Sequence, residues 1–362
     1  MNGWIIALCC MAGVGLAGVT FTHQPSFGRL PRGERKARME QSWHYKDGKW
    51  QNEDSTATFS AKRSEIRDMR KRRSDRLRPT EPVTTVQTDI STLPRDRDWM
   101  LWFGHSAYLF CLEGKLFLVD PALLSGSPVG FINRPFDQTY SYTPDDLPNV
   151  DYLIITHDHW DHLDYKTVKQ LRPRIGHVVT PLGVGAHLER WKFSEEQIVE
   201  RDWYEDWTAP DSTVFHFLPA RHFSGRGLRG NRTLWGSFLI ERGGRKVYVG
   251  GDSGYGRHFR WIGEHYADID LAVLENGQYD TLWSNIHTMP QYLGREAKEL
   301  GAQHVVTVHH SRFALANHDW DEPLRNELDA ALKDSINLSV LTIGQPVFLD
   351  DMPTTSLQSK AE

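Results

Sequence analysis

Short apolar runs that lead to a polar residue recur along the C-terminal two thirds of the chain. These runs are residues 116–119, 152–156, 214–218, 246–249 and 304–308, and they lead to Asp120, His157, His222, Asp252 and His309, respectively. Runs rich in β-branched residues and bounded by turn residues predict buried strands. Residues 164–171, 290–300 and 324–333 are predicted to be helical. Strands mixed with helices, with polar residues at one end, predict a layered α/β fold with a site at one edge.

The first residues of the chain differ from this pattern. Residues 4–21 carry no charge, a length just sufficient to span a bilayer or to form the core of a signal peptide. No Lys or Arg precedes this run, whereas Arg29, Arg32, Arg35, Lys36 and Arg38 follow it. Basic flanks stay in the cytoplasm, so the sequence favours an uncleaved membrane anchor with the body on the cytoplasmic face. The alternatives are a signal peptide or lipoprotein-type signal, which would place the body in the periplasm or cell envelope, and an apolar segment docked on the body.

A polar segment separates this run from the apolar strands. Its most charged part, residues 62–78, holds nine Lys and Arg residues against three acidic ones. Such a basic arm next to an anchor suits anionic lipid headgroups, although a solvated linker or an exposed helix has the same composition. We therefore divide the chain into a membrane anchor or signal segment (1–22), a polar, basic arm (23–97), a main domain that contains the apolar strands (98–350) and a tail (351–362).

Composition narrows the function only a little. The chain of 362 residues has a formal net charge of −5, which gives no overall signal for nucleic-acid binding, so no nucleic-acid partner is expected. Cys9 and Cys10 lie in the apolar run and Cys111 lies alone in a predicted strand. The body therefore has no disulfide framework, and the sequence does not require an oxidising compartment.

The densest chemical signal is the segment from His157 to His162, which reads His-Asp-His-Trp-Asp-His and directly follows a predicted strand. Neutral imidazoles and carboxylates suit zinc, and the lack of Cys argues against a closed structural zinc site. On a regular strand His162 would face away from His157, His159 and Asp161, whereas a loop that curls into a helix allows these residues to divide between two metal ions.

This motif, followed by a distant His, Asp and His, resembles the metallo-β-lactamase superfamily. Within it, the chain is most similar to the N-acylphosphatidylethanolamine-hydrolysing phospholipase D family and its bacterial relatives, including those labelled as outer-membrane or resistance-associated proteins. The similarity covers about residues 98–348 and rests on five stretches: 102–106 (WFGHS), 156–164 (THDHWDHLD), 234–237 (LWGS), 250–255 (GGDSGY) and 313–317 (FALAN).

The resemblance implies an αββα sandwich that holds two zinc ions per chain. It assigns His157, His159 and His222 to one ion, and Asp161, His162 and His309 to the other, with Asp252 as a bridge. His310 competes with His309 for its place, and His309 is preferred because it follows the strand at once. His287 matches a family position near the substrate, while Asp120 and His105 resemble groups that orient metal ligands. Asp161, Asp252 and His287 are the predicted catalytic residues.

The implied reaction is hydrolysis by a hydroxide that two metal ions share. A phosphodiesterase acting on an N-acylated phospholipid or a related lipid is the favoured function, with membrane association. The alternatives are a lactonase or phosphoesterase for a small soluble metabolite, and a non-catalytic envelope protein of the same fold. Residues 275–280 depart from the family pattern near the substrate mouth, which leaves the substrate open. Arg226, Arg229 and Arg232 are candidates for contact with a phosphate headgroup, or are simply solvated.

Overall fold

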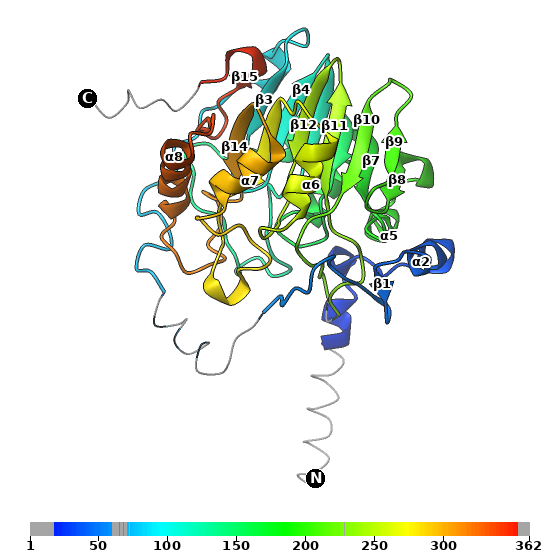
Figure 1. Ribbon diagram of the computed structural model, residues 1–362. Coiled ribbons are helices and arrows are strands. Elements are labelled where there is room, and N and C mark those ends of the chain that lie inside the picture. The colour runs from blue at the N-terminus through cyan, green and yellow to red at the C-terminus, as the bar shows by residue number, and fades with distance from the viewer. Residues whose placement is uncertain are drawn as a thin grey trace, which may run out of the picture.

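Two β-sheets form the centre of the molecule (Figure 1). The computed structural model describes residues 18–59, 65, 68, 71, 73–227 and 229–353. The first sheet contains, in spatial order, β15 (Val347–Phe348), β3 (Trp99–Trp102), β4 (Tyr108–Leu112), β5 (Lys115–Val119), β6 (Val150–Ile154), β7 (Ile175–Pro181) and β8 (Ile198–Arg201). The second contains β14 (His304–Val308), β13 (Leu271–Glu275), β12 (Arg245–Val249), β11 (Ser237–Arg242), β10 (Val214–Leu218) and β9 (Asp206–Thr208).

Each sheet mixes parallel and antiparallel strands. Strands β5 to β8 are parallel, and so are β12 to β14, whereas the remaining neighbours pair antiparallel. Because β10 and β12 are both antiparallel to β11, they point in the same direction. The carboxyl ends of β10, β12, β13 and β14 therefore lie at one edge of the second sheet, as those of β5 and β6 do in the first.

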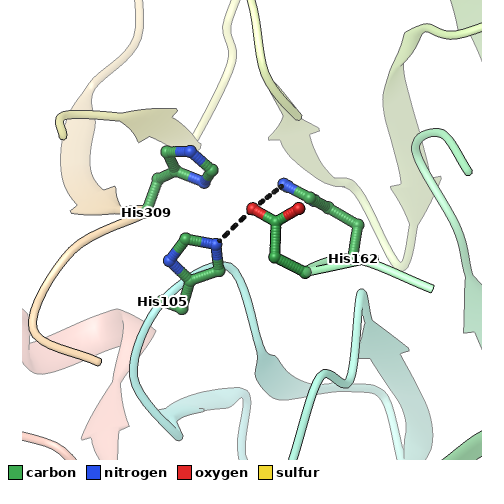
Figure 2. Close-up of side chains that lie close together, drawn as sticks. His105, His162 and His309 are labelled. Carbon is green, nitrogen blue, oxygen red and sulfur yellow. Dashed lines mark hydrogen bonds and ion pairs between the residues drawn. The ribbon is translucent and has the colours of Figure 1, made fainter. Parts of the chain in front are cut away.

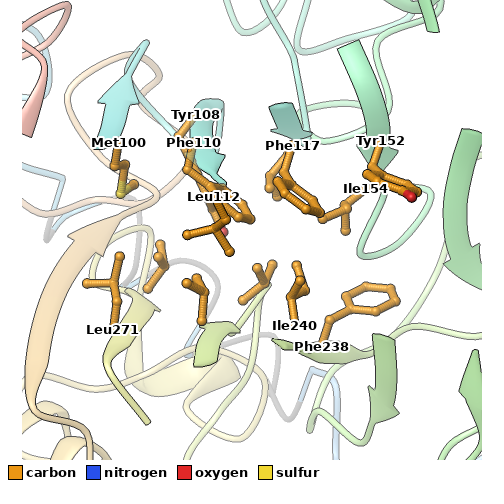
Figure 3. Packing of buried hydrophobic residues seen from close by; sticks show 14 of the residues in the cluster. Met100, Tyr108, Phe110, Leu112, Phe117, Tyr152, Ile154, Phe238, Ile240 and Leu271 are labelled. Atoms are coloured by element: carbon orange, nitrogen blue, oxygen red, sulfur yellow. The ribbon is translucent and has the colours of Figure 1, made fainter. Parts of the chain in front are cut away.

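The main core lies between the two sheets. Figure 3 shows Phe110 and Phe117 from the first sheet facing Phe238 and Ile240 from the second. Phe110 and Phe117 are register partners on neighbouring strands, and their rings stack with centroids 4.7 Å apart. The strand residues that point the other way are also buried, since helices cover the outer faces. Burial on both faces explains why the strands read as continuous apolar runs rather than as alternating ones.

Helices cover both outer faces of the sandwich. Residues of α4 (Tyr165–Leu171) and α5 (Gly185–Arg190) share a core with the first sheet. Residues of α6 (His258–His265), α7 (Leu293–Leu300) and α8 (Glu322–Asp334) share one with the second. Short 3₁₀ turns lie at η1 (Pro25–Phe27), η2 (Ile90–Thr92), η3 (Pro144–Asp146), η4 (Arg172–Arg174), η5 (Glu195–Gln197), η6 (Thr281–Trp283) and η7 (Leu349–Asp351). The layer order is αββα, which confirms the predicted fold class.

The N-terminal arm packs against the body over residues 23–59. It contains α2 (Gly33–Glu40) and a hairpin of β1 (Tyr45–Lys46) and β2 (Lys49–Trp50). Arg190 donates hydrogen bonds to the backbone oxygens of His23 and Gly28, and Arg35 forms ion pairs with Glu189 and Glu200. Much of the predicted arm is thus fixed on the body, and the boundary at residue 97 stays a prediction.

The predicted membrane anchor falls largely on residues 1–17, which lie outside the described residues, as does most of the stretch 60–72. Among the helices of the described residues, none combines the length and apolarity needed to cross a membrane.

The predicted strands 214–218 and 304–308 match β10 and β14 residue for residue. The predicted helix 164–171 begins one residue later, because Asp164 caps it by accepting a hydrogen bond from the backbone N–H of Lys166. Strand β6 ends at Ile154, two residues before the predicted end, so the histidine motif lies in a loop. The helix predicted at 290–300 begins at Leu293.

Candidate metal centre

Polar residues that follow strands of both sheets meet at the edge where β5, β6, β10, β12 and β14 end. Asp120 follows β5, and the motif that begins at His157 follows β6. From the second sheet, His222 follows β10, Asp252 follows β12 and His309 follows β14. All five are buried. The structure therefore brings together residues up to about half the chain apart in sequence, as the strand-end pattern predicts.

Three imidazoles form the first group of the site. The Nδ1 atom of His159 lies 2.8 Å from Nε2 of His157 and 3.2 Å from Nε2 of His222. Ligand nitrogens that share a tetrahedral ion at about 2.0–2.1 Å lie roughly 3.3 Å from one another. The three nitrogens are thus close to the separation that one shared ion would impose.

The outward-facing nitrogens of two of these rings already have partners. His157 Nδ1 lies 3.0 Å from Thr156 Oγ1, whose proton goes to Asp120 Oδ2 at 2.6 Å, so the imidazole is the donor. His222 Nδ1 donates to the carbonyl oxygen of Ile286 at 2.7 Å. Each neutral ring therefore keeps its lone pair on Nε2, which faces the other imidazoles. Both Nε2 atoms are therefore available to a cation, and His159 Nδ1 is a third ligand atom when that ring carries its proton on Nε2.

Burial also keeps this group neutral. It lowers the pKa of His157 and of His222 well below the ordinary value, and that of His159 to about 4. A metal ligand must present an unprotonated nitrogen. The three imidazoles meet this requirement at neutral pH.

The second group combines one carboxylate with imidazoles from three separate segments. Each of His105, Asp161, His162 and His309 offers a ligand atom within 4.8 Å of the others, and Figure 2 shows the three rings around one point. His105 Nε2 donates a hydrogen bond of 2.9 Å to Asp161 Oδ2. Asp161 Oδ2 lies 3.7 Å from His162 Nε2. This is the grouping of Asp161, His162 and His309 that the resemblance implies, with His105 beside the carboxylate.

Asp252 lies between the two groups. Its Oδ2 atom is 3.2 Å from His162 Nε2, and it is 3.7 and 3.8 Å from the Nε2 atoms of His222 and His157. Its Oδ1 atom is 3.1 Å from His309 Nδ1. One carboxylate thus reaches nitrogens of both groups, which is the position that a bridging ligand requires.

The charge at this edge matches a divalent cation. Burial disfavours a charged imidazole, yet the carboxylates of Asp252, Asp120 and Asp161 outweigh it and raise the pKa of His162 well above its ordinary range. The site therefore favours positive charge at its centre. Among the described residues, Nε2 of His162, Nε2 of His309 and Oδ1 of Asp252 are buried without a hydrogen-bond partner. A divalent ion would take the place of the proton on His162 Nε2, and nitrogen and carboxylate ligands without a thiolate fit a metal such as zinc.

Asp120, which lies outside these groups, and His105, which lies beside Asp161 in the second group, fix the orientation of the ligands. Asp120 accepts hydrogen bonds from His162 Nδ1 at 2.8 Å and from the backbone N–H of Thr156 at 2.9 Å. His105 holds Asp161, as described above. Asp120, His105 and His309 have φ angles of 39°, 52° and 71°, in the left-handed region that non-glycine residues rarely adopt. Strain of this kind gathers at functional sites, where the surrounding structure enforces it.

His287 lies beside the metal groups, and the residue that holds it was not predicted. Its Nδ1 atom shares a hydrogen bond of 2.8 Å with Oε2 of Glu275, the last residue of β13. The other oxygen of Glu275 accepts from the backbone N–H groups of Ser253 and Thr288. An acidic residue at a strand end is the same signal that marks Asp120. In the sequence, however, Glu275 is part of the departure from the family pattern at residues 275–280.

Asn52 is a second residue that sequence reasoning missed. Its side chain accepts a hydrogen bond from the backbone N–H of His222 at 3.1 Å and donates one to the backbone oxygen of His222 at 2.7 Å. The arm therefore clamps both sides of a candidate metal ligand. No local sequence signal reveals this contact, because Asn52 lies 170 residues before His222.

A cavity of about 370 Å³ opens over the two groups. Its polar residues include His159, Asp161, Asp252, His287 and His309, and its apolar walls are Phe59, Phe223, Trp283, Ile286 and Leu315. Phe59 belongs to the arm, and its ring stacks on Trp283 with centroids 6.4 Å apart. A larger hollow of about 550 Å³, lined mainly by residues 75–84 and 340–343, contains none of the predicted site residues.

Several candidate residues point elsewhere. His310 is buried against Trp102, with its nitrogens near the hydroxyls of Thr307 and Ser311. Arg226 donates to the backbone oxygens of Ser26 and Asp158 and stacks on Trp160. Arg232 donates to the backbone oxygen of Gly48. Arg226 and Arg232 therefore hold the arm and the motif loop, and neither lines the cavity.

Known proteins resemble this chain in sequence and in fold. Residues 117–310 match the family described as "Beta-lactamase superfamily domain". An uncharacterised protein of Mycobacterium tuberculosis is 36% identical over 321 residues, which cover 86% of each chain. N-acyl-phosphatidylethanolamine-hydrolyzing phospholipase D 1 of Caenorhabditis elegans is 29% identical over 247 residues, which cover 63% of this chain and 67% of that protein. A solved metallo hydrolase of Ignicoccus hospitalis aligns over 69% of this chain and 97% of its own, with a TM-score of 0.55 and 21% identity.

The matched family domain spans more than half of the chain and contains His157, His159, Asp161, His162, His222, Asp252 and His309. The structural likeness supports the fold alone, and the αββα layers agree with it. The chain therefore belongs to the β-lactamase superfamily, whose metallo-β-lactamase fold here carries the His and Asp groups of a metal-dependent hydrolase.

Proposed function

We propose that this chain is a dinuclear zinc hydrolase that cleaves a phosphodiester bond in an N-acylated phospholipid or a related lipid. The observation that carries the proposal is the position of Asp252 between two ligand groups at the floor of an apolar-walled cavity. His157, His159 and His222 would hold one ion, and Asp161, His162 and His309 the other. The name of the relative in Caenorhabditis elegans supports the substrate class.

The proposed reaction is the hydrolysis of the phosphodiester bond. An oxygen–phosphorus bond forms from water, and the bond between phosphorus and the headgroup oxygen breaks. The proton that the water loses is returned to the departing oxygen, so the products are a phosphatidic acid and an N-acylethanolamine. Two divalent ions held by these residues would lower the pKa of a bound water towards about 7 and would polarise the phosphoryl oxygen.

The chain's own residues supply orientation and proton movement. His287 lines the cavity, and its hydrogen bond to Glu275 fixes the ring through Nδ1. Burial raises the pKa of Glu275 well above its ordinary value, so its carboxyl group can donate to Nδ1 and leave the proton of the neutral ring on Nε2, the atom that can give a proton to the departing oxygen. Asp120 and His105 hold His162 and Asp161 in place, so the groups around the phosphorus need little rearrangement.

The cavity walls fit the lipid part of such a substrate. Phe59, Phe223, Trp283 and Leu315 offer apolar surface in the same cavity as the polar residues of the metal groups. An acyl chain buried there would contribute about 0.8 kcal/mol for each methylene group removed from water. A small soluble metabolite would leave this surface unused.

The test is to incubate the purified full-length protein with N-acylphosphatidylethanolamine in mixed micelles and to measure released N-acylethanolamine by mass spectrometry. We expect release that a chelator stops and added zinc restores. Hydrolysis of a lactone or a small phosphodiester, without lipid hydrolysis, would favour the soluble-substrate alternative. A protein with full metal content and no hydrolase activity would favour a non-catalytic envelope protein.

A variant tests the role of His287 separately. We expect His287→Gln to lower kcat by about 10²-fold or more, the contribution of a positioned acid–base group, and to leave the metal content unchanged. His216→Gln is the matched control, because His216 lies on β10 away from the cavity and pairs with Asp206. Equal kcat values for the two variants would remove His287 from the reaction.

We propose that the enzyme is held at a membrane. The uncharged run 4–21 and the basic residues after it support anchoring to a membrane, with the body on the cytoplasmic face. Fractionation of cells that express the full chain tests this. Intact protein in the soluble fraction would contradict the anchor, and an N-terminus near His23 would show a cleaved signal and place the body outside the cytoplasm.

A further inference from the structure

The loop that contains Phe131 and Ile132 is the most exposed apolar part of the described body. Phe131 is 79% exposed and Ile132 is 48% exposed. Soluble proteins leave single apolar side chains on their surfaces without consequence, so exposure alone would not mark this loop. The hollows and the arginine side chains next to this loop distinguish it from a single exposed apolar residue.

Three hollows connect this loop with the site and with the start of the described chain. The hollow beside Phe131 is also lined by Ala314, and the next residue, Leu315, lines the cavity over the metal groups. At the other end of the loop, Pro128 lines a hollow with Val19 and Phe21. The loop therefore adjoins both the residues next to the cavity and the described end of the uncharged run 4–21.

Arginine side chains lie next to the exposed apolar residues. Arg73, Arg78 and Arg134 line the hollow beside Phe131, against one acidic residue, Asp137. Arg78 donates to two backbone oxygens, and among the described residues no carboxylate pairs with it or with Arg134. Apolar side chains flanked by unneutralised arginines match the two layers of an anionic membrane surface, which are acyl chains below and phosphate above.

We propose that the loop 128–134 is a membrane-docking element, which inserts Phe131 and Ile132 into the interface of an anionic bilayer while Arg134 and Arg78 contact lipid phosphates. This inference rests on the proposed function, because it places the cavity mouth against the layer that would hold the substrate. Phe59, which lines the cavity, is itself 52% exposed.

A reporter on the loop tests the proposal in the full chain. Cys9 and Cys10 are first replaced by Ser, and Cys111 is buried and does not react readily. An environment-sensitive fluorophore is then placed at Ile132→Cys. The matched control carries it at Asp96→Cys, an exposed position before β3 and hence at the opposite edge of the sheets. Vesicles of equimolar phosphatidylcholine and phosphatidylserine are added, and quenching by iodide in water and by brominated acyl chains is measured.

We expect vesicles to reduce iodide quenching of the Ile132→Cys label several-fold and to make brominated lipid quench it, while the Asp96→Cys label stays accessible to iodide. Replacing Arg134 and Arg78 by Gln should weaken the effect at low salt more than at high salt, because salt screens charges on the scale of about 8–10 Å.

Vesicle-bound protein whose Ile132→Cys label stays as accessible as the control would overturn the proposal, even if the N-terminal segment anchors the chain. Protection that grows with protein concentration in the absence of vesicles would overturn it in favour of self-association. Neither measurement depends on hydrolysis, so a failed lipid substrate would leave this result distinct.

Discussion

Asp120 provides a sharp test of how the metal centre is held, because it contacts a candidate ligand without being one. Its Oδ2 atom accepts from His162 Nδ1 and from Thr156 Oγ1, and its Oδ1 atom accepts from the backbone N–H of Thr156. Asp120→Asn keeps the shape of the side chain and exchanges one acceptor for a donor. In either orientation of the amide, its buried NH₂ group faces a group that donated to Asp120, either His162 Nδ1 or the backbone N–H of Thr156.

The size of the effect follows from these contacts. If the amide N–H group faces His162, the imidazole must turn its lone pair to Nδ1 and carry its proton on Nε2, the nitrogen needed for metal binding. If it faces Thr156, a buried donor loses its acceptor, at a cost of about 1–3 kcal/mol. Loss of such an orienting partner lowers metal affinity by about 10–100-fold, which corresponds to roughly 1.4–2.7 kcal/mol.

The assay is competition with a chelator of known affinity, combined with elemental analysis of the metal that remains. We expect Asp120→Asn to weaken one ion per chain, the one held by Asp161, His162 and His309, and to affect the other less. Asp202→Asn is the matched control. Asp202 is a partly buried carboxylate that also contacts a histidine, His44, but it lies outside the motif loop and holds no candidate ligand. Equal metal loss in both variants, or none in either, would refute the reasoning.

The remaining predictions concern the candidate ligand His309, the contact of Asn52 with the backbone of His222, and the buried carboxyl group of Glu327. His309→Ala should lose about one metal ion per chain by elemental analysis, while His310→Ala retains both, and equal loss would show that the register at this strand end is misassigned. Asn52→Ala should weaken metal binding about 10–100-fold in the same chelator competition, whereas Gln51→Ala, at an exposed neighbour, should not. Burial raises the pKa of Glu327 to about 8, so between its ordinary pKa of 4.5 and 8 the folded state keeps a proton that the unfolded state has released. The unfolding free energy should therefore fall with rising pH in this window, by up to about 1.4 kcal/mol per unit from this group, and chemical denaturation should show a flatter pH dependence for Glu327→Gln.

The sequence predicts the fold at the strands whose ends carry polar residues. The runs 214–218 and 304–308 are buried on both faces and bounded by turns, so their apolar pattern is continuous and their limits are clear. The motif at 157–162 is harder to place, because its residues fit a strand or a loop equally well. Only the pairing of β6 with its neighbours, which stops at Ile154, makes it a loop. Tertiary pairing thus determines what local pattern leaves open.

The candidate ligands could be predicted because each is a chemically distinctive residue close to a strand end. Asn52 could not, since an Asn in a polar segment has no distinguishing pattern and its contact depends on how the arm folds back. Glu275 carries a usable signal, an acidic residue at the end of β13, but it also belongs to the stretch 275–280 that departs from the family pattern. The arm itself was predicted as a separate polar region, whereas residues 50–59 contribute both a clamp and a cavity wall.

The origin of the ligands explains why this site needs the whole sandwich. The first group takes His157 and His159 from the loop after β6, in the first sheet, and His222 from the loop after β10, in the second. The second group combines the same motif loop with His309, which follows β14 of the second sheet. A shift of one sheet against the other would therefore alter the distances in both groups at once. The aromatic core between the sheets resists such a shift, because close-packed side chains leave no room for sliding. The precision of the metal centre is thus a property of the packing between the two sheets, and the clamp that Asn52 places on His222 adds the arm to that framework.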